Sequence, residues 1–200
     1  MKAISLYSGA GGLDVGFVKA GFDILWANDF DKMACETYKN NIGNHIHCGD
    51  IESLKSQLYK YRSEVDIVFG GPPCQGFSVA GKMNPSDPRS NHIWTFSEIV
   101  DQVQPRAFVM ENVKALGELS KWSLLRNELL EKFKASGYSV NYIVVNASDF
   151  DVPQSRERVF FIGFKNNSFI IPDLNKMLQP YRKKGPTVRQ ALNVLDRAGQ

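Results

Sequence analysis

Short apolar runs alternate along the chain with longer stretches in which apolar residues recur every three or four positions. Short runs of this kind are typical of buried strands, and the longer spacing is typical of helices. The stretch 122–136 gives the clearest helical pattern, because Leu125, Leu129 and Phe133 lie four residues apart and Gly137 follows. The apolar runs predict seven strands, over residues 3–7, 22–27, 45–48, 65–69, 107–110, 138–145 and 158–164.

Strand–helix alternation is typical of a mostly parallel sheet that helices cover on both faces. The last two predicted strands are close enough in sequence to pair antiparallel. The sequence therefore predicts an α/β, doubly wound, mostly parallel sheet with an antiparallel strand near the end. Because the pattern decays after residue 164, we expect a catalytic and cofactor-binding domain over residues 1–165 and a tail over residues 166–200. Ligands of such sheets bind at the carboxyl ends of the strands.

Composition excludes several classes of protein. A chain of 200 residues with 43% hydrophobic residues can bury a core without disulfides or metals. That excludes a disordered, collagen-like or disulfide-stapled chain. The net charge of +3 neither demands nor excludes nucleic acid as a partner.

Neither a membrane span nor a secretory signal is expected from the distribution of apolar residues. The three cysteines, Cys35, Cys48 and Cys74, form no Cys-x-x-Cys pair. This usage favours a reduced, cytoplasmic protein in which two cysteines are small core residues.

The first candidate site is the segment 8–12, which reads SGAGG and joins the first strand to the first helix. Glycines here allow a tight turn and the close approach of a ligand, although a plain strand-to-helix turn is the alternative. The spacing differs from Gly-x-Gly-x-x-Gly, so it favours a nucleoside with an amino-acid tail over a pyrophosphate. Asp29, after the second strand, suits a ribose, with helix capping as the alternative; Asp50, after the third, suits an adenine amino group.

The second candidate site is the segment 70–78, GGPPCQGFS, after the fourth predicted strand. Two prolines stiffen the backbone and orient Cys74. No Cys or His lies near it at metal-ligand spacing, so no metal is expected there. A nucleophilic thiolate is the favoured interpretation, and a buried structural cysteine is the alternative.

Charged residues at the ends of two further strands complete the candidate site. Glu111 directly follows a buried run, and a parallel sheet would bring it close to the Cys74 loop. Arg156 and Arg158 precede the last strand and could hold phosphates or a carbonyl oxygen. A surface acid and a solvated salt-bridge edge are the respective alternatives.

Taken together, these motifs closely resemble those of the cytosine-5 DNA methyltransferase family, in order from Leu6 to about Phe164. Segment 8–12 resembles the adenosylmethionine loop of that family, and segment 71–78 resembles its nucleophile loop. Segments 111–113 and 154–158 match two further signatures. The proline-cysteine loop together with Glu-Asn-Val is specific, whereas the glycine loop alone would not be.

The resemblance implies a Rossmann-like enzyme that transfers a methyl group from S-adenosyl-L-methionine to C5 of a cytosine flipped out of double-stranded DNA. Cys74 would add to C6, protonated Glu111 would bond N3 and the exocyclic amine, and Arg158, supported by Arg156, would bind O2. The family usually has Phe in place of Tyr7 and often Glu in place of Asp29. By resemblance the cofactor pocket comprises Tyr7, Gly9, Ala10, Gly12, Asp29, Phe30, Asp50, Ile51 and Pro73.

Family members usually continue into a target-recognition region and a Gly-Asn segment, neither of which is found before Gln200. We therefore expect either a fragment or a split methyltransferase whose complementary chain supplies the rest. An RNA cytosine-5 methyltransferase and a catalytically silent subunit are alternatives, and the glycine spacing disfavours a nicotinamide-binding domain. The resemblance implies cytoplasmic, bacterial or archaeal use in DNA methylation and restriction-modification.

Overall fold

A computed structural model of the chain describes residues 1–73, 91–166 and 170–193. Seven strands form one sheet in the order β3-β2-β1-β4-β5-β7-β6. All neighbouring strands are parallel except β7, which is antiparallel to both β5 and β6. The predicted fold class is thereby confirmed, including the antiparallel strand near the end. The strands are β1 (Lys2–Leu6), β2 (Asp23–Asp29), β3 (Ile46–Cys48), β4 (Ile67–Gly70), β5 (Ala107–Val113), β6 (Tyr138–Asn146) and β7 (Glu157–Lys165).

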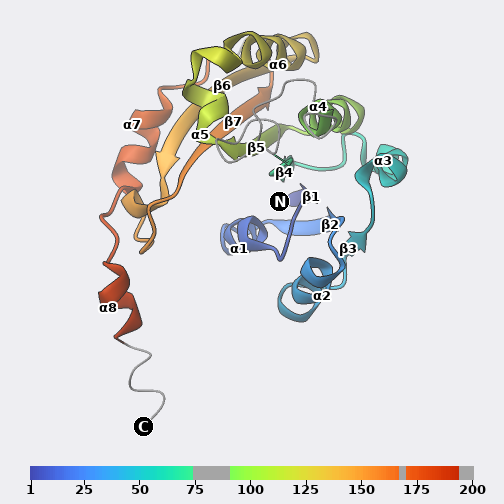
Figure 1. Cartoon of the computed structure of the whole chain (residues 1–200). Helices are drawn as coiled ribbons and strands as arrows, with labels where there is room; N and C mark the ends of the chain where they lie inside the picture. Colours follow the sequence, from blue (N-terminus) through green and yellow to red (C-terminus); the bar gives the residue numbers. More distant parts are fainter. Residues whose placement is uncertain (74–90, 167–169, 194–200) are drawn as a thin grey trace.

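Helices pack on both faces of the sheet (Figure 1). Residues of α4, α5 and α6 belong to the larger core cluster on one face, and residues of α1 and α2 pack with the smaller cluster on the other. Two short helices, α5 and α7, were not predicted, because five residues are too few to establish a helical period. The helices are α1 (Gly12–Lys19), α2 (Lys32–Asn41), α3 (Ile51–Leu54), α4 (His92–Val103), α5 (Lys114–Glu118), α6 (Ser123–Ala135), α7 (Leu174–Leu178) and α8 (Val188–Leu192).

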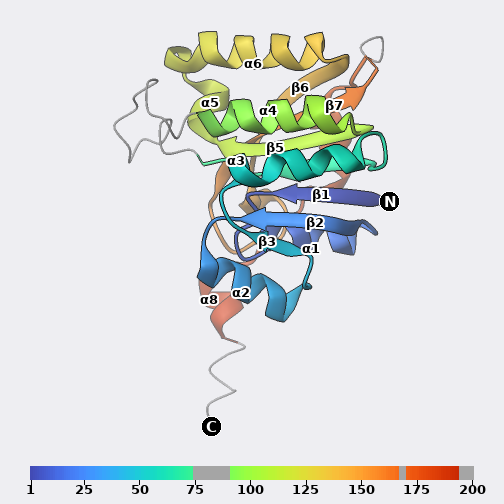
Figure 2. The ribbon, with the colours of Figure 1, turned by 90° about the vertical axis from the view of Figure 1, so that its right-hand side faces the viewer.

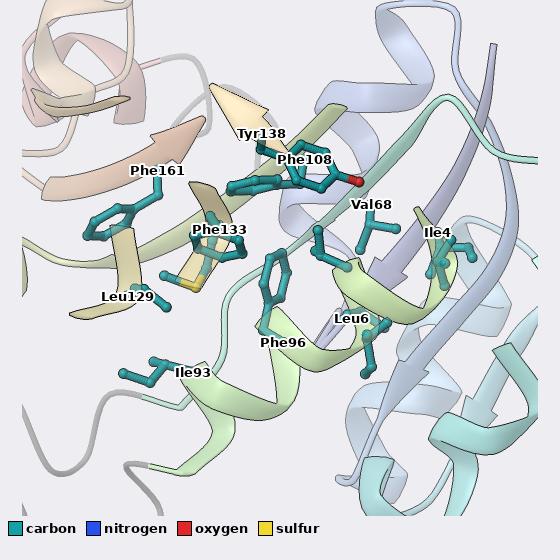
Figure 3. Close-up of a cluster of buried hydrophobic side chains, with 14 of the residues drawn as sticks. Ile4, Leu6, Val68, Ile93, Phe96, Phe108, Leu129, Phe133, Tyr138 and Phe161 are labelled. Carbon is teal, nitrogen blue, oxygen red and sulfur yellow. The ribbon is translucent and has the colours of Figure 1, made fainter. Parts of the chain in front are cut away.

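The larger core is built around aromatic rings between α4, α6 and the sheet (Figure 3). Phe108 of β5 stacks on Phe133 of α6 with ring centroids 4.1 Å apart, and it meets Tyr138 edge to face at 5.3 Å. Burying each such ring stabilises the fold by roughly 1.5–3 kcal/mol. This core therefore fixes β5, the strand that carries Glu111.

Two local predictions had different outcomes. The sequence predicts a helix to about residue 41 with Asp31 as its cap, because Asp is a preferred N-cap residue. Asp31 Oδ1 accepts the Ala34 backbone N–H at 3.0 Å, which confirms the cap. Cys35 is buried, but Cys48 is exposed at the end of β3, so the prediction of two core cysteines is wrong for Cys48. Only Ile46 of this three-residue strand is buried, and His47 and Cys48 at its end are exposed.

The carboxyl ends of β1, β2 and β5 lie at one edge of the sheet (Figure 2). Because β7 is antiparallel to β5, the start of β7 lies at this same edge. Within the described ranges, no helix combines the length and the apolar character needed to cross a membrane.

Candidate active site

A cavity of about 440 Å³ opens at the carboxyl edge of the sheet, a volume within the range of small-molecule sites. Five of the residues predicted to bind the cofactor lie on its wall, and three residues that were not predicted lie beside them. The predicted residues are Tyr7, Phe30, Asp50, Ile51 and Pro73, and the others are Asn28, Gly49 and His92. These residues lie at or just after the ends of β1, β2, β3 and β4 or begin α3 and α4, so four strand ends and two helix starts meet at the cavity.

The remaining predicted cofactor residues, Gly9, Ala10, Gly12 and Asp29, lie in or against the glycine loop and not on the cavity wall. Asp29 holds this loop: its Oδ2 accepts the Gly9 N–H at 2.6 Å, while its Oδ1 accepts the Asp31 N–H at 2.9 Å. Each carboxylate oxygen keeps a second lone pair for another donor. A Cβ at Gly9 or Gly12 would meet no atom within 4 Å, so the loop presents open backbone there.

Asn28 shapes the far wall of the cavity and was not predicted as a site residue. Its side chain is buried, and its Nδ2 donates to the carbonyl oxygens of His47 and Gly49, each at 2.9 Å. These two bonds tie the end of β2 to the turn that carries Asp50. Asp50 also begins α3, because its Oδ1 accepts the Glu52 N–H at 3.0 Å. A sequence motif alone does not distinguish such an inward amide from a surface one.

Tyr7 and His92 form a polar pair on the cavity wall. The Tyr7 hydroxyl lies 3.3 Å from both Nδ1 and the carbonyl oxygen of His92, and the two rings meet edge to face. Burial raises the pKa of Tyr7 far above its usual range, so the hydroxyl stays protonated and can donate. The resemblance to the family implies that residues 78–92 form a loop over the flipped base that touches phosphates. Most of that loop lies outside the described residues, and His92 begins α4 and lines the cavity.

Glu111 and Arg158 meet on adjacent strands at the same edge of the sheet. Arg158 Nε donates to Glu111 Oε1 at 2.8 Å, and the side chains are 25% and 23% exposed, respectively. Burial raises the pKa of the Glu111 carboxyl, while the nearby charges of Arg158 and Arg156 oppose that increase. Arg156 lies just before β7, where its backbone N–H donates to Asn146 Oδ1 at 3.0 Å. The predicted acid and both predicted arginines are therefore close together.

The segment Gly71–Pro73 connects the cavity to this acid. A Cβ at Gly71 would lie 3.0 Å from Glu111 Oε2, so a larger residue here would press on the carboxylate. On the other side of β5, buried Asn112 donates from Nδ2 to the Pro72 carbonyl oxygen at 3.2 Å. Pro73 then reaches the cavity wall. Cys74, the predicted nucleophile, lies outside the described residues.

The Asn112 contact explains why an amide follows Glu111. Successive strand residues point to opposite faces, so Glu111 faces Arg158 while Asn112 faces the core and holds the proline loop. Among the residues that the structure describes, no group of three His, Cys, Asp or Glu side chains could hold a metal ion.

Comparison with known proteins gives consistent matches. A family model described as C-5 cytosine-specific DNA methylase matches residues 1–197. Type II methyltransferase M.AquIA of Picosynechococcus is 39% identical to this chain, over 97% of this chain and 88% of that protein. Type II methyltransferase M.FnuDI of Fusobacterium nucleatum is 42% identical, over 84% of this chain and 48% of that protein.

Solved structures share the fold. A protein described as a DNA modification methyltransferase encoded within an E. coli prophage superposes with a TM-score of 0.78 and 32% identity, covering 96% of this chain and 54% of that one. The Dnmt2 methyltransferase of S. pombe, at 22% identity and a TM-score of 0.73 over 94% of this chain and 57% of that one, is alike in fold. The chain thus spans most of M.AquIA but about half of M.FnuDI and of the prophage protein.

Proposed function

The chain belongs to the C-5 cytosine-specific DNA methylase family, and from this premise we propose that it transfers a methyl group from S-adenosyl-L-methionine to C5 of cytosine in double-stranded DNA. The position of Gly71–Pro73 carries the proposal, because this segment contacts Glu111 at one end and lines the 440 Å³ cavity at the other. The described part of the predicted nucleophile loop therefore connects a cofactor-sized cavity with an acid. With DNA as its substrate, the enzyme would work in the cytoplasm.

The cavity suits S-adenosyl-L-methionine, which when bound supplies an electrophilic methyl group on a positively charged sulfur. Phe30 is 78% exposed although it is aromatic, and it offers a flat apolar surface for the adenine ring, opposite Ile51. Asp50 would accept from the adenine amino group, and Asp29 would use its remaining lone pairs for the ribose hydroxyls. The open backbone of Gly9, Ala10 and Gly12 leaves room for the amino-acid tail.

The Glu111–Arg158 pair suits the cytosine ring. Protonated Glu111 would donate to N3 and accept from the exocyclic amine, and Arg158 would hold O2 with Arg156 in support. Cys74 thiolate would then add to C6, which increases the electron density at C5. After C5 has gained the methyl group, loss of the C5 proton and departure of Cys74 restore the aromatic ring. A stacked base cannot reach these groups, so the cytosine must be flipped out.

Methyl transfer from labelled S-adenosyl-L-methionine tests the proposal directly. Duplex DNA, single-stranded RNA and folded RNA should be offered separately to the protein, alone and together with the segment encoded downstream. We expect label in 5-methylcytosine of duplex DNA. Label confined to RNA would instead establish the RNA methyltransferase alternative, and binding of a nicotinamide cofactor in calorimetry would overturn the methyltransferase assignment.

Replacement of Asp29 by Ala is expected to weaken S-adenosyl-L-methionine binding by roughly 1–3 kcal/mol, the scale of a lost charged hydrogen bond. The variant loses the proposed ribose acceptor, and it also releases the Gly9 N–H that Asp29 holds at 2.6 Å. Isothermal titration calorimetry measures the change. Asp23→Ala, at the opposite end of the same strand, is the matched control and should bind as wild type does. Unchanged affinity in Asp29→Ala would remove Asp29 from the cofactor site.

Partly exposed apolar residues on one face of the sheet are an argument for a further polypeptide partner. Phe160 and Ile162 of β7 point away from α4 and α6, neither is buried, and neither belongs to the two core clusters. Interior strands of sheets of this type usually have both faces covered by helices. We infer that a continuation of the chain or a complementary chain packs here, while residues 1–165 form the catalytic unit and residues 166–200 form a tail.

The tail itself is a poorer candidate for that contact than the sequence suggested. The sequence predicts that the apolar tail residues Ile170, Ile171, Leu174, Leu178, Leu192 and Leu195 contact the partner. Leu174, however, is buried within this chain. Ile170 is exposed, Ile171 and Leu178 are half-buried, and Leu192 is exposed, whereas Leu195 lies outside the described residues.

Co-expression with the segment encoded downstream is expected to raise the melting temperature by about 5–10 °C, because a partner at 100 times its Kd adds about 2.7 kcal/mol. Specific DNA methylation should increase in the same complex. Differential scanning calorimetry and methyl transfer measure the two effects. Ile162→Asp should remove both gains, whereas Val18→Asp on exposed α1 is the control. A chain that alone methylates a defined sequence at about 1 s⁻¹ or faster would contradict the need for a partner.

A further inference from the structure

A second cavity, of about 610 Å³, lies between the β6–β7 loop and the tail. The loop contributes Ser148, Asp149 and Ser155, and the tail contributes Arg182, Lys183 and Lys184. The loop joins the end of β6 to the start of β7, so the cavity lies at the sheet edge that carries Glu111 and Arg158. No role assigned so far to the catalytic or cofactor residues uses this cavity.

Backbone pairing between the loop and the tail builds the cavity wall. Lys183 N–H donates to the Asp149 carbonyl oxygen at 2.7 Å, and Asp151 N–H donates to the Lys183 carbonyl oxygen at 2.9 Å. Gly185 N–H then donates to the Ser148 carbonyl oxygen at 2.9 Å. A Cβ at Gly185 would lie 2.6 Å from the Val152 carbonyl oxygen, so a glycine is required for this approach. The three basic side chains are therefore presented from a fixed backbone.

The charges on the wall are not balanced. Arg182 Nη1 pairs with Asp149 Oδ2 at 2.7 Å, and Lys183 Nζ pairs with Asp151 Oδ2 at 2.7 Å. Lys184, the third basic residue of the run, is exposed and makes no ion pair with any described residue. The cavity thus has one uncompensated cation.

Ser155 lies on the same cavity wall as Lys184, and Arg156 follows Ser155 in the sequence. Asn146 Nδ2 donates to Ser155 Oγ at 3.3 Å. The hydroxyl of Ser155 is therefore still free to donate its hydrogen to an anion. Arg156, the next residue, brings a second positive charge to the start of β7. A cation, a hydroxyl donor and an adjacent guanidinium are together the usual partners of a phosphate group.

We propose that this cavity binds a backbone phosphate of the substrate DNA close to the flipped nucleotide, with Lys184 as its cation and Ser155 as its hydrogen-bond donor. The proposal rests on the proposed function. A flipped nucleotide rotates about its own backbone, so the flanking phosphates must pass the edge at which Glu111 and Arg158 receive the base. A phosphate held here would position the strand and carry no sequence information.

The test measures the DNA-binding constant of wild type, Lys184→Ala and Ser155→Ala between about 50 and 200 mM salt. The salt slope is the decrease in log K per unit of log salt concentration, and each lost phosphate contact lowers it by about 0.9. Lys184→Ala should show this decrease and bind roughly five- to tenfold more weakly at about 0.1 M salt. Ser155→Ala should weaken binding with an unchanged slope, because it removes no charge. Lys39→Ala is the control, since Lys39 lies in the last turn of α2, far from this edge.

Cofactor binding, measured by calorimetry, separates this inference from the proposed function. Lys184→Ala with the wild-type salt slope, in a protein that still binds S-adenosyl-L-methionine and methylates DNA, overturns the phosphate site alone. If the wild type binds neither S-adenosyl-L-methionine nor DNA, the proposed function is overturned, and this inference is overturned with it. Thermal melts without DNA, with and without millimolar inorganic phosphate, test the free ion. If phosphate raises the melting temperature of wild type but not of Lys184→Ala, and the two proteins have the same salt slope for DNA, the cavity binds free phosphate instead.

Discussion

Cys74→Ser is expected to abolish covalent trapping of the protein on duplex DNA that contains 5-fluorocytosine, and to reduce methyl transfer by on the order of 10³-fold or more, as removal of a catalytic nucleophile does. The thiolate is the stronger nucleophile, and fluorine at C5 prevents the proton loss that releases it from C6. The prediction rests on the proline segment Gly71–Pro73, which precedes Cys74 in the sequence and reaches from Glu111 to the cavity wall. Denaturing gel electrophoresis with labelled DNA measures the adduct.

Cys48→Ser is the matched control for this experiment. Cys48 is exposed at the end of β3, so it is accessible to the same reagents, but the proposed mechanism does not use it. The control should be trapped as efficiently as wild type. Equal trapping of wild type and Cys74→Ser would show that another group attacks the base.

The strands were predictable because each is a short apolar run that ends at a polar or glycine residue. Such runs need only local burial on one or both faces, and the sheet provides it for every strand except β3, of which only Ile46 is buried. Asp31 was predictable as a cap for a similar reason, since its hydrogen bond spans only three residues. Helix α5 packs against β6 and β7, and helix α7 packs against β6. These contacts join distant parts of the chain, so no local sequence pattern predicts the two helices.

The pairing of functional groups required the order of the strands. Glu111 and Arg158 lie 47 positions apart in the sequence, and they meet because β7 inserts between β5 and β6. The sequence identified both residues through motifs, but the 2.8 Å contact follows from the topology. Asn28 and Asn112 were missed as supports because an amide that holds a loop cannot be distinguished by type from one in solvent.

Asp29 has a structural role that its sequence position did not indicate. Its position after β2 suggested a ribose acceptor or a helix cap. Both oxygens accept backbone N–H groups, from Gly9 and from Asp31, so the side chain builds the glycine loop. A ribose contact would add to that structural role through the remaining lone pairs.

Glu111→Gln is expected to reduce kcat by about 10²- to 10⁴-fold, the usual contribution of a general acid, while DNA binding is retained. Glutamine keeps an N–H donor for the cytosine ring but has no proton to transfer to N3. Burial raises the pKa of Glu111, and Arg158 and Arg156 oppose the increase. Because the acid form is the active one, wild-type kcat should fall as pH rises through that pKa. Steady-state methyl transfer across a pH series measures both effects.

The pH profile distinguishes a catalytic carboxyl from a structural one. Glu111→Gln should lose the alkaline decline that the wild type shows, because the amide does not titrate. A Glu111 that only braced Arg158 through the 2.8 Å contact would give a variant with reduced activity and an unchanged pH profile. Glu118→Gln on α5 is the matched control, since Glu118 makes only a half-exposed ion pair with Lys114 and should keep wild-type kcat and pH dependence. Retention of wild-type kcat by Glu111→Gln would exclude proton transfer by this residue.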